Sequence, residues 1–195
     1  MDLLPLTGQY PAWINSYQSR LTRNQAAACF GSATPFRLGR FIRHAWTGPL
    51  RSLADVYVSF RLYNVEVKSG KHNSRHLIAV DCVNGTLDPC RFDRIPSDSE
   101  ITRIETRNAL VPKLEETITR EIASQHIRRE AYRTGFLSAT PIQLRAERPA
   151  LEFYLPFWIG FFGHGEVARL SVLDAFNHRF HGAKARAFFE AWILS

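Results

Sequence analysis

Histidine and aspartate side chains gather near the carboxyl end of the chain. His164, His178 and His181 lie close together in the sequence, with Asp174 among them. Imidazole and carboxylate groups bind divalent metals, and the same pair of groups performs general acid–base catalysis. However, His178 and His181 are expected to straddle a turn, and their spacing fits no familiar ligand pattern. We therefore predict no metal, no cofactor and no catalytic residue, and we keep an enzyme with a site near Asp174, His178 and His181 as a third alternative.

Two aspartates occupy matched positions in the two halves of the chain. Asp81 lies in the segment AVDCVN (79–84), and Asp174 lies in VLDAFN (172–177). A symmetric pair of carboxylates is compatible with acid–base chemistry. An aspartate just before a tight turn, however, commonly accepts hydrogen bonds from nearby backbone amides and fixes the turn. We expect this structural role for both residues.

Positive charge is concentrated in the first part of the chain. The net charge is +7, and no Asp or Glu occurs between Leu3 and Ala54. Most of the basic residues are arginines, which bind carboxylates and phosphates in a bidentate manner and stack on aromatic rings. Ordinary solvated faces are the alternative explanation. We predict a surface for an anionic partner that is formed by six arginines: Arg20, Arg23, Arg37, Arg40, Arg43 and Arg51.

The function class follows from this charge and from the absence of familiar catalytic motifs. The sequence has no phosphate-binding loop, no nucleophile elbow and no metalloprotease helix. We therefore predict a non-enzymatic binding protein or accessory subunit that contacts an acidic protein partner or an anionic surface through its arginine-rich region. A nucleic-acid-binding protein is the alternative, because Phe36, Phe41 and Trp46 lie among the arginines and suit base stacking.

A second, weaker contact is predicted from aromatic residues near the carboxyl end. The segment 153–162 reads as a strand with apolar residues on both faces. Either both faces are buried, or one of them docks an apolar partner or a membrane interface. The candidate contact residues are Tyr154, Trp158, Phe162 and Trp192.

An internal similarity decides the fold prediction. Residues 32–38 read SATPFRL and residues 138–144 read SATPIQL, and further similar segments follow each of them in the same order. Such self-similarity indicates a duplicated structural unit. We predict an α+β fold with tandem duplicated helix-plus-antiparallel-sheet units and a short C-terminal helix. The first repeat spans 1–95 and the second spans 96–195.

The expected elements follow from hydrophobic periodicity and turn residues. Helices are predicted at 12–30, 112–134 and 183–194, and a connector at 93–111. Strands are predicted at 55–67, 75–83, 86–92, 151–162 and 167–176. Asn84-Gly85 predicts a tight hairpin turn. Residues 36–45 fit either a strand or a helix.

Location is inferred from composition. The three cysteines make no disulfide framework, which favours free thiols in a reducing compartment. No apolar run approaches the roughly 20 residues of a membrane-spanning helix. We expect a cytoplasmic protein that is either soluble or peripheral to a membrane or to a large complex.

Overall fold

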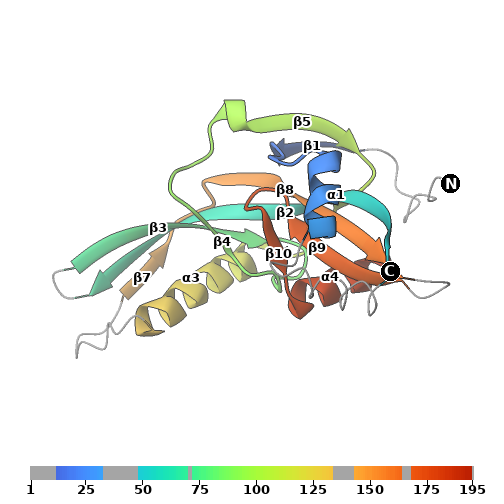
Figure 1. Ribbon diagram of the computed structural model, residues 1–195. Helices are drawn as coiled ribbons and strands as arrows, with labels where there is room; N and C mark the ends of the chain where they lie inside the picture. Colours follow the sequence, from blue (N-terminus) through green and yellow to red (C-terminus); the bar gives the residue numbers. More distant parts are fainter. Residues whose placement is uncertain (1–11, 33–47, 70–71, 134–142, 164–167, 195) are drawn as a thin grey trace. The chain divides into compact units, whose positions relative to one another are not determined.

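The computed structural model describes residues 12–32, 48–69, 72–133, 143–163 and 168–194. Figure 1 shows the elements in chain order: β1 (Ala12–Tyr17), α1 (Arg23–Ser32), β2 (Leu50–Ser69), β3 (His72–Asp81), β4 (Cys90–Phe92), η1 (Asp98–Glu100), β5 (Ile101–Thr106), β6 (Ala109–Leu110), α3 (Glu116–Arg133), β7 (Gln143–Ala146), β8 (Leu151–Phe162), β9 (Arg169–Asp174), β10 (Arg179–His181) and α4 (Ala183–Ile193).

The described residues form mostly β-sheet. Hydrogen bonds join ten described strands into one sheet in the order β10-β9-β8-β2-β3-β4, while β1 pairs with β5 and β8, and β6 and β7 pair with β2. Strands account for 47% of the described structure and helices for 27%. The prediction of tandem helix-plus-antiparallel-sheet units is therefore wrong, because strands from both halves of the chain join one sheet instead of closing two separate ones.

Each half of the chain contains a hairpin, and the strands of the two hairpins pair in the same register. In the β2–β3 hairpin Phe60 lies opposite Asp81, and in the β8–β9 hairpin Phe157 lies opposite Asp174. In each hairpin the residue after the aspartate donates its amide to the carbonyl of the residue before the phenylalanine, at 2.8 Å in the first and 3.1 Å in the second. The matched aspartates of the sequence therefore occupy equivalent places in two hairpins.

The chain divides into two compact units. Unit 1 comprises Met1–Tyr57, Thr102–Ala109 and Leu155–Ser195, and unit 2 comprises Val58–Ile101 and Leu110–Tyr154. Each unit therefore combines segments from before and after residue 95.

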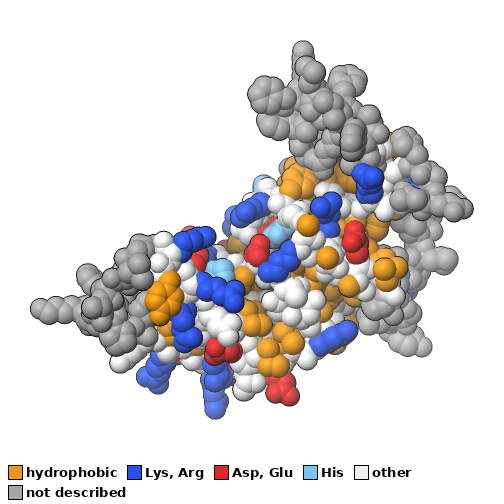
Figure 2. Space-filling model, turned by 90° about the horizontal axis from the view of Figure 1, so that it is seen from below, with side chains coloured by type: hydrophobic (Ala, Val, Ile, Leu, Met, Phe, Trp, Pro, Cys, Tyr) orange, Lys and Arg blue, Asp and Glu red, His pale blue; other side chains and the backbone are white. Residues whose placement is uncertain are grey.

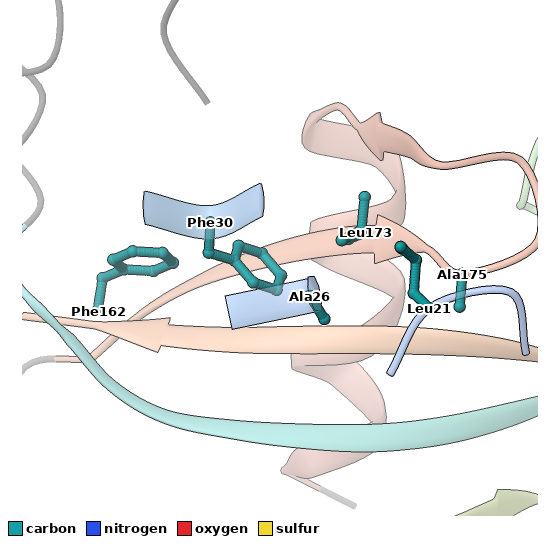
Figure 3. Close-up of a cluster of buried hydrophobic side chains, with 6 residues drawn as sticks. All are labelled: Leu21, Ala26, Phe30, Phe162, Leu173 and Ala175. Atoms are coloured by element: carbon teal, nitrogen blue, oxygen red, sulfur yellow. The ribbon is translucent and has the colours of Figure 1, made fainter. Parts of the chain in front are cut away.

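In unit 1, the helix of the first half covers strands of the second half. The buried cluster in Figure 3 contains Leu21, Ala26, Phe30, Phe162, Leu173 and Ala175. The α1 helix begins with a capping box, in which the Gln25 side chain accepts a hydrogen bond from the Thr22 amide at 2.9 Å. Residues 12–17 form the strand β1, so the helix predicted at 12–30 is wrong over its first part.

In unit 2, the helix of the second half covers strands of the first half. The buried cluster contains Tyr63, Val65, Ile78, Val80, Ala123 and Ile127. The Tyr63 hydroxyl and Thr119 Oγ1 lie 2.6 Å apart in this core. On α3, Ile118 is 47% exposed, whereas the polar residue Thr119 is buried. Figure 1 shows α3 running alongside β3 and β7.

Several predicted elements need correction and others are confirmed. The strand predicted at 151–162 and the helix at 183–194 are confirmed as β8 and α4. The predicted connector 93–111 contains η1, β5 and β6. The predicted strand 86–92 shortens to β4, so the loop around Asn84-Gly85 is wider than a two-residue hairpin turn. Residues 36–45 lie outside the described residues.

Two findings bear on the expected location. Among the described helices, none has the length and apolar character needed to cross a membrane. Cys29, Cys82 and Cys90 are free cysteines. Burial raises the pKa of the Cys82 thiol to about 11, so this thiol is not a nucleophile at neutral pH.

Candidate anion-binding surface

The excess positive charge belongs almost entirely to unit 1. By sequence, unit 1 contains 12 Lys and Arg residues against 6 Asp and Glu residues, whereas unit 2 contains 13 against 12. Unit 1 therefore accounts for nearly all of the net charge of +7. Net charge affects association with charged partners more than it affects the choice of fold.

The described basic side chains of unit 1 face solvent, whereas only two of its four described carboxylates do. Asp174 is buried, and Asp55 is half-buried and accepts a hydrogen bond from the Tyr57 hydroxyl at 3.1 Å. Only Glu105 and Glu190 are exposed acids among the described residues of unit 1. The exposed cations of unit 1 in the described residues are Arg20, Arg23, Arg51, Arg103, Arg107, Arg169, Arg179, Lys184 and Arg186.

Several basic side chains of unit 2 form ion pairs with its acidic side chains. These pairs are Arg61–Glu152, Lys68–Glu66, Arg91–Glu130, Arg94–Glu100 and Arg120–Glu116. No described carboxylate forms an ion pair with the unit 1 residues Arg23, Arg107, Arg169, Arg179 and Arg186, or with the unit 2 residues Lys113, Arg128, Arg129, Arg145 and Arg148. The units therefore differ in their exposed carboxylates and not in ion pairing, because the described residues of unit 2 expose seven: Asp88, Asp93, Asp98, Glu115, Glu121, Glu147 and Glu152. Figure 2 shows basic and acidic side chains interspersed on the face that it presents.

The helix ends show the same difference. In unit 1, Arg23 is the first residue of α1 and Lys184 lies in the first turn of α4, and neither first turn contains an acid. In unit 2, α3 has Glu116 in its first turn and Arg133 in its last. A cation near a helix N-terminus opposes the helix dipole, whereas an acid there is stabilising. The helix dipole therefore does not favour the cations at the start of α1 and α4.

Arg20 is held against the turn between β9 and β10. Its guanidinium carbon lies 5.0 Å from the centroid of the Phe176 ring, and its amide donates to the Ala175 carbonyl at 3.3 Å. The Tyr17 ring packs edge-on against Phe176, with centroids 4.5 Å apart. Arg179 begins β10 directly after this turn. The turn thus fixes one arginine of the first half beside residues of the second half within unit 1.

Both matched aspartates fix turns, as expected. Asp81 Oδ1 accepts hydrogen bonds from three successive amides, 83–85, and Oδ2 accepts one from the amide of residue 87, all at 2.9–3.1 Å. Asp174 Oδ1 accepts hydrogen bonds from the Phe176 and Asn177 amides at 2.8 and 2.9 Å. In each turn the fourth residue after the aspartate has a positive φ: +69° at Gly85 and +55° at His178. These carboxylates are structural.

The histidine candidates are only partly brought together. His181 Nε2 lies 3.6 Å from Asp174 Oδ2, and this buried nitrogen has no hydrogen-bond partner among the described residues. Burial raises the pKa of Asp174, but the nearby His181 ring and hydrogen bonds from Asn177 and Phe176 outweigh burial and hold the pKa below its usual value. His178 is exposed, and His164 lies outside the described residues. Within the described residues, no three His, Cys, Asp or Glu side chains are grouped as metal ligands would be.

The predicted partner residues are placed as follows. Arg20, Arg23 and Arg51 are exposed, while Arg37, Arg40 and Arg43 lie outside the described residues. Of the aromatic candidates, Tyr154, Trp158 and Trp192 are half-buried, and Phe162 is buried in the core of unit 1. The indole of Trp158 donates to the Leu21 carbonyl at 3.3 Å. Burial thus removes Phe162 from any surface.

Sequence reasoning missed the basic residues of the carboxyl end, namely Arg169, Arg179, Lys184 and Arg186. In the sequence, acidic residues such as Asp174 lie among these cations and nearly balance their charge. The sequence did contain a signal for these surface cations. Asp174 was expected to fix a turn, and a carboxylate that is bonded to its own turn does not balance a cation on the surface.

Comparisons with protein-family models, with curated proteins and with solved structures give no match to this chain.

Proposed function

We propose that this chain is a non-enzymatic binding or accessory protein that docks an acidic protein partner through the exposed cations of unit 1. One observation carries the proposal. Within its described residues, unit 1 exposes nine Lys and Arg side chains but only two carboxylates. Interfaces of this kind attract a partner of complementary charge and fix its orientation.

The contrast with unit 2 supports a localised role for these charges. If the positive charge served solubility alone, it would have no reason to concentrate in one unit. Unit 2 is nearly neutral by sequence, and its ion pairs involve side chains such as Arg61 and Glu152, which lie 2.8 Å apart. The unit 1 cations are mostly arginines, whose planar guanidinium groups bind carboxylates in a bidentate manner.

Nucleic-acid binding is the second candidate, and one exposed ring favours it. Trp13 is 60% exposed, and the Arg103 guanidinium carbon lies 5.1 Å from the centroid of a Trp13 ring. Both residues belong to unit 1. An exposed aromatic ring beside an arginine can stack on a nucleobase while the arginine contacts phosphate.

The two candidates are separated by native affinity purification of the tagged protein at low salt, with and without nuclease, followed by mass spectrometry. The matched variant carries Arg23→Glu, Arg179→Glu and Arg186→Glu. All three side chains are exposed, so we expect the variant to fold normally. The wild-type protein should retain a discrete set of acidic proteins after nuclease treatment, and the variant should lose them.

Two results would count against this proposal. Proteins that the variant retains as well as the wild type do not bind through unit 1. Proteins that are lost on nuclease treatment, with nucleic acid in the untreated sample, establish the second candidate in place of the first.

A further inference from the structure

A cleft of about 490 Å³ lies in unit 2 where the short edge strand β4 ends. Its walls come from β2, β3, β4 and the segment that follows β4. The lining residues are Asn64, Arg75, His76, Leu77, Arg91, Phe92, Asp93 and Ile95. Ile95 is 49% exposed. The cleft therefore combines cationic groups with an apolar wall beside a strand edge.

The β3 strand is longer than the strand that covers it. On one side β3 pairs with β2 from His72 to Asp81, but on the other side β4 pairs only with Leu77–Ala79. Among the described residues, no strand pairs with the outer edge of β3 before Leu77. An uncovered edge of this kind presents unpaired amide and carbonyl groups to an incoming chain.

The hydrogen-bond pattern identifies which backbone groups face outward. The Cys82 amide bonds to the Ser59 carbonyl of the neighbouring segment, in continuation of the β2–β3 register. Because hydrogen-bonded positions alternate along an antiparallel pair, the even-numbered residues of β3 bond to β2 and the odd-numbered ones face away. The amides and carbonyls of Asn73 and Arg75 therefore point to the open edge.

Arg75 is the exposed cation at this edge, and its contact with a carboxylate is loose. The Arg75 side chain is 70% exposed, and its Nε lies 3.9 Å from Glu66. On the other face of the strand, His76 Nε2 lies 3.0 Å from the Ser74 hydroxyl, and Arg91 forms an ion pair with Glu130. Of the residues that line the cleft, Asp93 is the only carboxylate.

We propose that the open edge of β3 binds an extended acidic segment of a partner protein as an added strand. The backbone of that segment would bond to Asn73 and Arg75 in line with β4, and its acidic side chains would lie on the same face of the sheet as the Arg75 guanidinium group. Its alternate, apolar side chains would lie on the opposite face, beside the His76 ring. Strand addition of this kind takes affinity from main-chain bonds and specificity from alternating side chains.

A second copy of this chain is a poorer occupant of the same edge. Antiparallel pairing of two β3 edges centred on Arg75 would place the Arg75 side chains of the two copies directly opposite one another. Like charges directly opposite one another destabilise strand pairing. The proposal goes beyond the function proposed for unit 1, because it depends on unit 2 residues alone.

The test is fluorescence anisotropy with a labelled hexapeptide of alternating glutamate and valine, and with a lysine–valine peptide as the charge control. The protein variants are Arg75→Ala and Arg75→Pro. Both remove the guanidinium group, but only proline removes the outward amide, while the bonds to β2 are kept. We expect wild-type protein to bind the glutamate peptide alone, and Arg75→Pro to bind about tenfold more weakly than Arg75→Ala.

Hydrogen exchange on the wild-type protein checks the same edge without a variant. The peptide should slow exchange of the Asn73 and Arg75 amides and leave the Ser74 and His76 amides unchanged, because these already bond to β2. The proposal is overturned if wild type binds neither peptide or both equally, or if Arg75→Pro binds like Arg75→Ala. It is also overturned if the Arg23→Glu, Arg179→Glu, Arg186→Glu variant of unit 1 loses the peptide.

Discussion

Unit 1 and unit 2 contain hairpins of the same register, yet their charged side chains have different surroundings. Asp81 and Asp174 fix equivalent turns in the two units through bonds to backbone amides. In unit 2 exposed carboxylates such as Glu115, Glu121 and Glu147 accompany the exposed cations, while the described residues of unit 1 expose nine cations and only two carboxylates. The shared feature is therefore structural, and the feature that differs is the place to look for function.

The helices show why stability does not explain the difference. The first and last turns of α3 carry charges that agree with the helix dipole, whereas Arg23 and Lys184 oppose it in α1 and α4. A side chain that acts against its own helix is retained more readily when it serves another purpose, such as binding.

The largest expected effect concerns the shared turns. Replacing Asp81 or Asp174 by alanine leaves several backbone amides without an acceptor, so each change should lower the free energy of unfolding by about 2–4 kcal/mol. Asp81→Ala should cost more, because Asp81 accepts from four backbone amides, whereas Asp174 accepts from two backbone amides and the Asn177 side chain. Urea unfolding of both variants measures the difference.

Exposed carboxylates in each unit provide the control for these turns. Glu105→Ala in unit 1 and Glu121→Ala in unit 2 should change the unfolding free energy by less than about 0.5 kcal/mol. If Asp174→Ala were as mild as these controls, the two turns would not be equivalent.

The two turns differ in the residue type that occupies their position of positive φ. A Cβ at Gly85 would lie 2.5 Å from Ile122 Cδ1, so Gly85→Ala should destabilise unit 2 through both the contact and the backbone conformation. His178 adopts the same region without being glycine, so His178→Gly should stabilise unit 1 by about 1 kcal/mol. Thermal unfolding of both variants should show melting temperatures that move in opposite directions. A lower melting temperature for His178→Gly would contradict the equivalence.

The smallest expected effect concerns the start of α4. Lys184→Glu and Arg186→Glu place acids near a helix N-terminus that has no side-chain cap, and each should stabilise the protein by about 0.3–1 kcal/mol. The same changes should weaken partner binding, because they remove exposed cations. Chemical unfolding and binding of the two variants are measured together. Variants that gain stability with unchanged binding would remove α4 from the proposed surface.

Local features were predictable from the sequence, whereas the pairing of distant segments was not. The apolar run in 151–162 and the aspartates before turns correctly predicted β8 and the turn-fixing roles of Asp81 and Asp174. The helix α1 packs on Phe162 and Leu173 of the other half. Contacts between segments so far apart in the sequence cannot be predicted from a local pattern. Residues 12–17 form the strand β1 in the folded protein, although Trp13, Ile14 and Tyr17 have helical spacing. Tertiary packing therefore outweighs the local pattern here.

The candidate surface was predicted in part. Arg20, Arg23 and Arg51 are exposed, as a binding role requires. Arg179 and Arg186 were missed, because charge was counted along the sequence, where Asp174 offsets a cation. In the folded unit Asp174 is buried and bonded to its own turn, so it leaves the surface charge unbalanced.

The most direct test compares two variants of equal net charge for affinity to the partner captured by wild-type protein. One carries Arg23→Glu, Arg179→Glu and Arg186→Glu in unit 1, and the other carries Lys113→Glu, Arg145→Glu and Arg148→Glu in unit 2. All six side chains are exposed. The account predicts that the unit 1 variant binds at least about tenfold more weakly while the unit 2 variant binds like wild type. Equal weakening of both variants would show that net charge, and not a surface on unit 1, governs binding.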